Sequence, residues 1–76
     1  MQIEGFTQKF AEAIDEDGLA TAPPDTNFRK LKNWDSMAAF SVMAMVDKDY
    51  GVLLKDTEMR KTETIQQLYD LVASKK

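Results

Sequence analysis

The sequence predicts an all-α domain, a bundle of three main helices and one short helix with a long first loop. Two features carry this prediction. Apolar residues recur every three or four positions in several segments, which is the spacing of one face of an α-helix. Residues that start or stop helices stand at the ends of these segments. The 76 residues are enough for one small domain, so we assign positions 1–76 to a single unit.

The first helix is expected over residues 3–15. Its apolar positions recur at helical spacing and therefore share one face; they are Phe6, Phe10, Ala13 and Ile14. Gly18 is the residue that we expect to stop the helix, because glycine favours the position just beyond a helix C-terminus.

A long connection is expected over residues 18–34. Pro23 and Pro24 cannot continue a helix, because proline lacks the backbone N–H and clashes with the preceding turn. A connection of this length is uncommon in so small a domain and points to a functional role. Four apolar side chains are expected to hold it against the helices: Leu19, Phe28, Leu31 and Trp34. For Trp34 the alternative interpretation is a recognition residue.

The second helix is expected over residues 36–50. Asp35 or Ser36 can cap its start, and Gly51 suits its end. Because the helix is apolar nearly all round, it is either central or presents an apolar face to another molecule. One stripe is assigned to the core: Ala39, Val42, Met43, Val46 and Tyr50. The other begins beside Ser36 and is assigned to partners: Met37, Phe40, Ser41, Ala44 and Lys48.

Two further helices are expected after Gly51. A short one, capped by Asp56, covers residues 56–60. The last begins at Thr64, because Thr64 and Gln67 have the spacing of a capping box. Its buried face is expected to consist of Ile65, Leu68, Leu71 and Val72.

The composition excludes several kinds of chemistry. The chain has no Cys and no His, so disulfides, thiol nucleophiles, imidazole bases and the usual zinc ligand sets are ruled out. It contains no glycine-rich phosphate loop and no EF-hand sequence. Carboxylate pairs such as Asp47 and Asp49 are interpreted as a solvated helix end. We therefore expect no metal site, no catalytic residues and no enzyme activity of the chain itself.

The charge pattern also narrows the partners. The formal charge is −3, from 13 acidic and 10 basic residues. A nucleic-acid-binding domain would carry a basic stripe, so we expect no nucleic-acid partner. The first residues show neither a basic leader nor a long apolar run, and no apolar segment reaches about 18 residues. The expectation is a monomeric cytoplasmic protein without a membrane span.

The junction before the second helix reads Trp34-Asp35-Ser36-Met37. Here the sequence resembles the acyl carrier protein family, whose modification site reads Asp-Ser-Leu, with Met37 as a conservative departure. Residues 50–56 are similar to the family's aromatic-x-x-x-Ile-x-Asp segment, and residues 64–65 (Thr-Ile) are similar to its Thr-Val start of the last helix. Since the resemblance spans nearly the whole chain, it implies the four-helix bundle of the acyl-carrier-protein type.

The resemblance implies that Ser36 is the attachment point of a 4′-phosphopantetheine arm. A phosphopantetheinyl transferase would move the arm from coenzyme A to the Ser36 hydroxyl, and Asp35 would help to bind the Mg²⁺ ion of that reaction. The arm ends in a thiol, so a chain without Cys can carry acyl intermediates as thioesters. The implied role is a non-catalytic carrier in fatty-acid-like or polyketide-like biosynthesis, with acyl-loading, acyl-transfer and synthase enzymes as partners.

The outer face of the second helix departs from the family pattern. In fatty-acid-synthesis carriers this face is usually acidic, whereas here Ala38 and Ser41 stand two and five residues after Ser36. Three basic residues precede the site, and we interpret them as a solvated face: Arg29, Lys30 and Lys32. Because charge complementarity mainly sets association rate and specificity, we expect dedicated partners in a specialised pathway instead of the standard fatty acid synthase enzymes.

Family members can also shelter an acyl chain between helices. We assign five residues to such a pocket: Met43, Val46, Leu54, Met59 and Leu68. Methionine suits this role because its flexible side chain adapts to irregular space. The alternative interpretation of the same residues is ordinary packing in the core.

Two other functions remain open at this point. One is a peptidyl, aminoacyl or D-alanyl carrier, which has the same arm and an amino-acid cargo. The other is an unmodified helical interaction module in which Ser36 only caps the helix. Modification of Ser36 separates the module from both carriers, whereas the identity of the cargo does not follow from the sequence.

Overall fold

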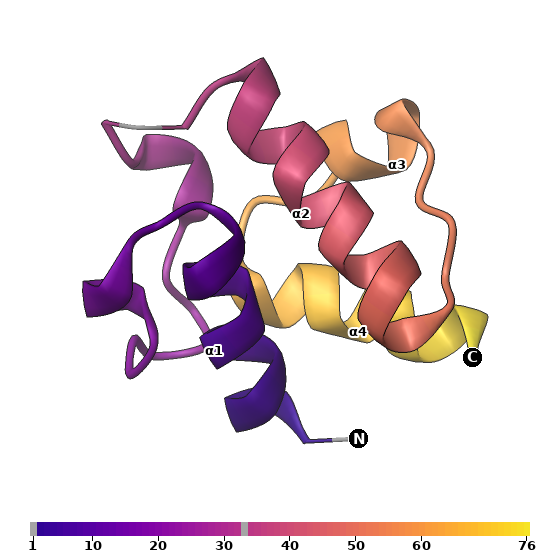
Figure 1. The fold of residues 1–76 in the computed structure, drawn as a ribbon, viewed down its shortest axis with the longest axis horizontal. Helices are drawn as coiled ribbons and strands as arrows, with labels where there is room; N and C mark the ends of the chain where they lie inside the picture. The colour runs from indigo at the N-terminus through magenta and orange to yellow at the C-terminus, as the bar shows by residue number, and fades with distance from the viewer. Residues whose placement is uncertain (1, 33) are drawn as a thin grey trace.

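The computed structural model describes residues 2–32 and 34–76. Over these residues the chain forms four α-helices and no β-strand, in the order α1 (Ile3–Ala13), α2 (Ser36–Tyr50), α3 (Asp56–Arg60) and α4 (Ile65–Lys75). Two 3-10 turns, η1 (Asp17–Leu19) and η2 (Phe28–Lys30), lie between α1 and α2. In Figure 1, α2 crosses α4, with α1 on one side and α3 on the other. The prediction of an all-α bundle with three main helices and one short helix is confirmed.

The first helix buries one face and ends earlier than expected. Phe6 and Phe10 are fully buried, as their spacing predicted. The helix stops at Ala13, and Asp15 adopts the left-handed conformation (φ 57°) that usually favours glycine. The prediction that Gly18 ends the helix is therefore wrong, because this residue lies in η1. Aspartate can occupy the left-handed region since its short polar side chain hydrogen-bonds locally.

The connection between α1 and α2 is anchored by its apolar side chains. Phe28 is fully buried, Leu19 is buried, and Leu31 and Trp34 pack partly buried against the same core. The Phe28 ring centroid lies 5.3 Å from that of Phe10 and 4.6 Å from that of Trp34. Trp34 also lies parallel to Phe10, at 6.0 Å. The anchoring role predicted for these four residues of the connection is confirmed.

Backbone hydrogen bonds join this connection to the start of α4. Residues 24–28 and residues 63–66 run side by side although they are distant in sequence. Their three bonds run from Phe28 N–H to the Glu63 carbonyl (3.1 Å), from Ile65 N–H to the Thr26 carbonyl (3.2 Å) and from Gln66 N–H to the Pro24 carbonyl (2.8 Å). Such bonds satisfy main-chain groups that an irregular segment would otherwise leave unpaired. The long connection is therefore an ordered part of the fold.

The second helix has the predicted bounds because local chemistry fixes both of its ends. Asp35 is the N-cap, and its Oδ1 accepts a hydrogen bond from the Ala38 N–H at 2.8 Å. Gly51 follows the last helical residue in the left-handed conformation, with φ 67°. A glycine reaches this conformation without steric cost, so the helix stops here.

The two stripes assigned to this helix separate in the structure. Val42 and Val46 are fully buried, and the other residues of the core stripe are partly buried: Ala39, Met43 and Tyr50. Every member of the second stripe is exposed: Met37, Phe40, Ser41, Ala44 and Lys48. Two residues outside the predicted core stripe, Ala38 and Met45, are also buried. Spacing could not show this, because a helix that is apolar nearly all round has no sharp boundary between its faces.

The N-cap of the short helix α3 lies one residue before the predicted cap. The N–H of Lys55 is satisfied by Glu58 Oε1 at 2.9 Å, so Lys55 occupies the cap position. Asp56 is the first residue of the helix and not its cap, contrary to the prediction. Its carboxylate instead pairs with Arg60 one turn later, at 3.1 Å. Met59 is the one buried residue of this helix.

The last helix starts with the capping box that the sequence predicted. The Thr64 hydroxyl accepts a hydrogen bond from the Gln67 N–H (3.1 Å), and Gln67 Oε1 accepts one from the Thr64 N–H (3.3 Å). The predicted buried face is also present, with three residues fully buried and the fourth, Leu71, partly so; the three are Ile65, Leu68 and Val72. Each such side chain contributes roughly 1.5–3 kcal/mol by leaving water.

Candidate functional site at the start of helix α2

Ser36 is the first residue of α2 and is exposed to solvent. The capping bond is made by Asp35, so the start of the helix does not depend on the Ser36 hydroxyl. Within residues 2–32 and 34–76, Ser36 Oγ has no hydrogen-bond partner. The sequence left two candidates for the cap, and the structure assigns the role to Asp35. The Ser36 hydroxyl is consequently free to react with a molecule that approaches from outside.

The environment of this hydroxyl favours a negatively charged substituent. It lies at the N-terminus of a helix of 15 residues, where the helix dipole is positive and the first N–H groups have no partner within the helix. The first turn of α2 contains no acidic residue, and the carboxylate of the preceding N-cap, Asp35, is bonded to the Ala38 N–H. Helix N-termini of this kind bind phosphate groups readily.

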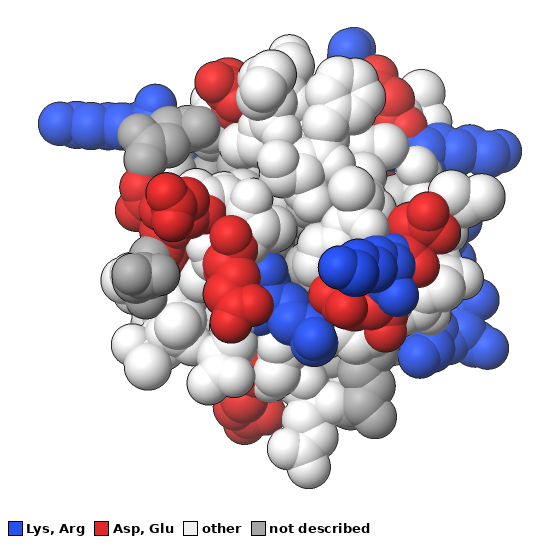
Figure 2. Space-filling view, in the orientation of Figure 1, with Lys and Arg blue, Asp and Glu red and all other residues white. Residues whose placement is uncertain are grey.

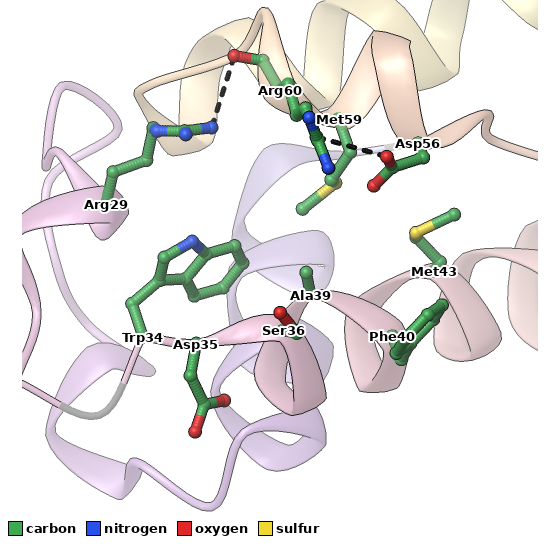
Figure 3. A pocket seen from close by; sticks show the side chains of 10 residues that line it. All are labelled: Arg29, Trp34, Asp35, Ser36, Ala39, Phe40, Met43, Asp56, Met59 and Arg60. Carbon is green, nitrogen blue, oxygen red and sulfur yellow. Dashed lines mark hydrogen bonds and ion pairs between the residues drawn. The ribbon is translucent and has the colours of Figure 1, made fainter.

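The hydroxyl opens onto a cleft of about 450 Å³. Its walls come from three parts of the chain: the end of the long connection, the first two turns of α2, and α3. The lining residues are Arg29, Trp34, Asp35, Ser36, Ala39, Phe40, Met43, Asp56, Met59 and Arg60. Figure 3 shows the Ser36 hydroxyl directed into the space between these walls, whereas the Asp35 carboxylate is turned away from it. Its volume falls in the usual range of small-molecule sites.

One wall of the cleft is fixed by an arginine from the opposite side. Arg29 Nη1 donates to the Arg60 carbonyl at 3.2 Å and to the Thr62 carbonyl at 3.4 Å. These bonds connect η2 to the end of α3 across 31 residues of sequence. Arg29 is exposed, as the interpretation of residues 29, 30 and 32 as a solvated face expected, but it also makes these two hydrogen bonds, which the sequence did not predict. Lys30 and Lys32 are exposed, as expected.

A second polar contact holds α3 from the other side. Lys75 Nζ lies 2.7 Å from Glu58 Oε2, which ties α3 to the last turn of α4. The hydrogen bond from Lys75, followed by the one from the Lys55 N–H, lowers the pKa of the Glu58 carboxyl below its ordinary value. The short helix is thus held by one buried methionine and by side-chain contacts at both ends.

The stripe assigned to partners forms an exposed face next to the cleft. Met37 is 75% exposed and Phe40 is 67% exposed, which is unusual for large apolar side chains. Figure 2 shows that uncharged atoms cover much of the surface over α2. Phe40 lines the cleft as well, because it stands one helical turn after Ser36. Ala38, which we expected on this outer face, is buried instead.

The residues assigned to an acyl pocket divide into two groups. Met43 and Met59 line the cleft beside Ser36. The other three lie in the core and do not line it: Val46, Leu54 and Leu68. Ala39 also lines the cleft and was not predicted to do so, although it stands three residues after Ser36 and helical spacing could have identified it. Asp56 and Arg60 were not predicted either, and no local signal exists for them because a distant segment brings them to the cleft.

Neither a metal site nor a membrane-crossing helix is found in the part of the chain that the structure describes. No group of three or more acidic, His or Cys side chains there could hold a metal ion. No helix in the same residues is long and apolar enough to cross a bilayer. Asp35 is the acidic residue that directly precedes Ser36, and Asp56 borders the same cleft from α3.

The fold and the junction at Ser36 define a class: a small helical domain that presents a free hydroxyl at a helix start, beside an open cleft. Comparison with known proteins then narrows the class. The chain is 29% identical over 72 residues to polyketide-8 synthase acyl carrier protein 2 of Streptomyces avermitilis, covering 95% of this chain and 82% of the relative. It is 28% identical over 68 residues to an acyl carrier protein of Thermosynechococcus vestitus, covering 84% of each.

These relatives support the acyl carrier protein family that the sequence resembles, over most of the length of the chain. No family model matches the chain, and no solved structure gives a significant match.

Proposed function

We propose that the chain is a carrier of acyl groups, held as thioesters on a 4′-phosphopantetheine arm attached to Ser36. The observation that carries the proposal is the exposed Ser36 hydroxyl, which has no partner among the described residues and stands at the start of α2. Curated relatives of similar length are named acyl carrier proteins, which supports the same role. One of them belongs to a polyketide synthase, which favours a specialised biosynthetic pathway.

The residues around Ser36 fit the arm. Its phosphodiester would lie beside the unpaired N–H groups at the start of α2. The cleft that opens at Ser36 has both apolar and hydrogen-bonding walls, as a chain of amide and methyl groups requires. When bound, the arm supplies the thiol that this Cys-free chain lacks. The protein's own contribution is to hold the attachment point in the open and to present α2 to other proteins.

The partners follow from the same proposal. A phosphopantetheinyl transferase transfers the arm from coenzyme A to Ser36 Oγ with Mg²⁺, and Asp35 is exposed next to Ser36, where its free oxygen can help to hold that ion. Acyl-loading, acyl-transfer and synthase enzymes dock on the exposed face of α2, which comprises Met37, Phe40, Ser41, Ala44 and Lys48. The chain itself works as a single-domain, cytoplasmic, monomeric and non-catalytic carrier. Tethering raises the effective concentration of the acyl group at each partner.

Intact-protein mass spectrometry tests the proposal. Incubation with coenzyme A, Mg²⁺ and a promiscuous phosphopantetheinyl transferase is expected to add one phosphopantetheine per chain. The Ser36→Ala variant should gain nothing, whereas Ser74→Ala, which removes an exposed hydroxyl on α4, away from the docking face, should be modified fully. Failure of the folded wild-type chain to gain mass with two different transferases would overturn the proposal. It would favour an unmodified interaction module.

A further inference from the structure

Arg60 lines the same cleft as Ser36 but comes from the opposite wall. Ser36 lies on α2 and Arg60 ends α3, and both border the cleft. Figure 3 shows the Arg60 guanidinium beside Met59, facing the cavity across from the Ser36 hydroxyl. A group attached to Ser36 that folds back into the cleft therefore meets this guanidinium.

The hydrogen-bonding capacity of Arg60 is only partly used. Its Nε lies 3.1 Å from Asp56 Oδ2. In residues 2–32 and 34–76, the two terminal nitrogens of its guanidinium have no hydrogen-bond or ion-pair partner. A guanidinium carries five N–H donors in a planar fork that matches the two oxygens of a carboxylate. Arg60 thus retains the N–H donors that can bind both oxygens of one carboxylate.

The charges around the cleft also favour an anion. Asp56 is matched by Arg60, and the Asp35 carboxylate is turned away from the cavity. Arg29 also borders the cleft, and its hydrogen bonds go to the neutral carbonyls of residues 60 and 62, so no carboxylate neutralises it through them. The same bonds fix the backbone of Arg60. Two carboxylates, those of Asp35 and Asp56, border the cleft as well, so the preference for an anion rests on the orientation of Asp35 and on the unused donors of Arg60, and not on the net charge of the lining.

The cleft also offers little room for a long alkyl chain. Its apolar lining consists of Trp34, Ala39, Phe40, Met43 and Met59. Val46 and Leu68, which would have to line a deeper tunnel, are fully buried in the core. The volume of about 450 Å³ must accommodate part of the arm together with its cargo. These dimensions suit a short acyl group.

We infer that the cleft selects short acyl groups that end in a carboxylate, and that Arg60 binds this carboxylate. The inference rests on the proposed attachment of the arm to Ser36. It makes Arg60 a specificity-determining residue, held in place by Arg29. It also distinguishes the acyl carrier from an aminoacyl carrier, whose cargo bears an ammonium group.

Nuclear magnetic resonance of the loaded protein tests the inference. The transferase would attach the bare arm from coenzyme A, or an arm that already carries its acyl group from malonyl-, butyryl- or β-alanyl-coenzyme A. These three acyl groups are similar in size and end in a carboxylate, a methyl group and an ammonium group, respectively. The signals to follow are the Arg60 Nε–H and the indole N–H of Trp34, the single tryptophan. The malonyl form is expected to shift both signals relative to the butyryl and β-alanyl forms.

Two variants assign the effect to the cleft. In Arg60→Gln the Trp34 signal of the malonyl form should coincide with that of the butyryl form. In Lys61→Gln, which removes a neighbouring exposed charge outside the cleft, the difference should remain. Thermal unfolding of both variants before loading shows that each is folded.

Three outcomes would overturn the inference. One is that malonyl and butyryl forms give the same spectra. Another is that the β-alanyl form gives the larger shift. The third is that the unloaded arm alone produces the whole Arg60 shift, which would identify the phosphodiester as the bound anion. Absence of any mass gain on loading would instead overturn the attachment to Ser36, so the two failures are distinguishable.

Discussion

The two short elements that wall the cleft, η2 and α3, are held in very different ways. Phe28 of η2 is fully buried between Phe10 and Trp34, and its N–H is bonded to the backbone before α4. The one buried residue of α3 is Met59. Beyond it, α3 depends on side-chain contacts with Arg29 and Lys75.

The difference indicates which wall can adjust. Aromatic side chains in a close-packed core tolerate little change of volume, and the hydrogen bond from the Phe28 N–H to the Glu63 carbonyl fixes the start of η2. A methionine adapts its shape, and exposed ion pairs contribute little to stability. We therefore expect the cleft to change width by movement of α3, while η2 and Trp34 stay in place.

The largest expected loss of stability is in the wall of the cleft that η2 forms. Phe28→Ala should lower the free energy of unfolding by about 3–5 kcal/mol, because a fully buried ring is replaced by a cavity. Met59→Leu should cost less than about 1.5 kcal/mol, since it conserves volume at an adaptable position. Urea unfolding at equilibrium measures both values. Phe40→Ala, in which the ring is 67% exposed, is the matched control and should change stability by less than about 0.5 kcal/mol.

A result in which Met59→Leu is as costly as Phe28→Ala would contradict the comparison, because α3 would then be as tightly specified as η2. If Phe28→Ala leaves too little folded protein to measure, Phe28→Leu provides the milder substitution at the same position.

A smaller loss of stability is expected at Asp35, where the connection that contains η2 meets α2. Asp35→Ala removes the cap from the Ala38 N–H and should cost about 1 kcal/mol. Ser36→Ala, one residue later, should leave stability nearly unchanged, because its hydroxyl caps nothing. Paired urea titrations of the two variants measure the difference. A loss of stability in Ser36→Ala equal to that in Asp35→Ala would show that Ser36 shares the capping role.

The smallest effect on stability is expected in α3, the wall that can move, and this effect depends on pH. The pKa of Glu58 is lowered in the folded protein, so its contact with Lys75 stabilises the fold above the ordinary glutamate pKa of about 4.3. This contribution disappears as the pH falls through the lowered folded value. Glu58→Gln should therefore be less stable than the wild type at pH 7 and equal to it at pH 2. Unfolding curves at both pH values test this, and a difference that persists at pH 2 would contradict it.

Local signals explain how much of this structure the sequence could predict. The bounds of α2 and the start of α4 were predictable because Asp35, Gly51 and Thr64 act within a few residues of themselves. The end of α1 was not, since Asp15 takes the left-handed position for which Gly18 was expected. Here a nearby aspartate replaced the glycine that the rule favours.

Only the part of the site that neighbouring residues of the sequence form could be predicted. Ser36 and the exposed face of α2 follow from the helix start and its spacing. The other wall of the cleft depends on Arg29 reaching the carbonyl of Arg60, 31 residues away, and no sequence pattern encodes this contact. The burial of Ala38 was missed for a related reason: it depends on what packs against α2, and the helix itself is apolar on nearly every side.

Asp35 caps helix α2 and Ser36 does not, and this difference has a consequence for the protein's lifetime in the cell. Because Asp35 alone caps the helix, the proposed esterification of Ser36 should leave that cap intact, and the contacts of the arm with the helix start and the cleft can only favour the folded state. Degradation commonly tracks the population of opened chains, so modified molecules should be turned over no faster than bare ones. Pulse-chase mass spectrometry can measure the lifetimes of the two forms.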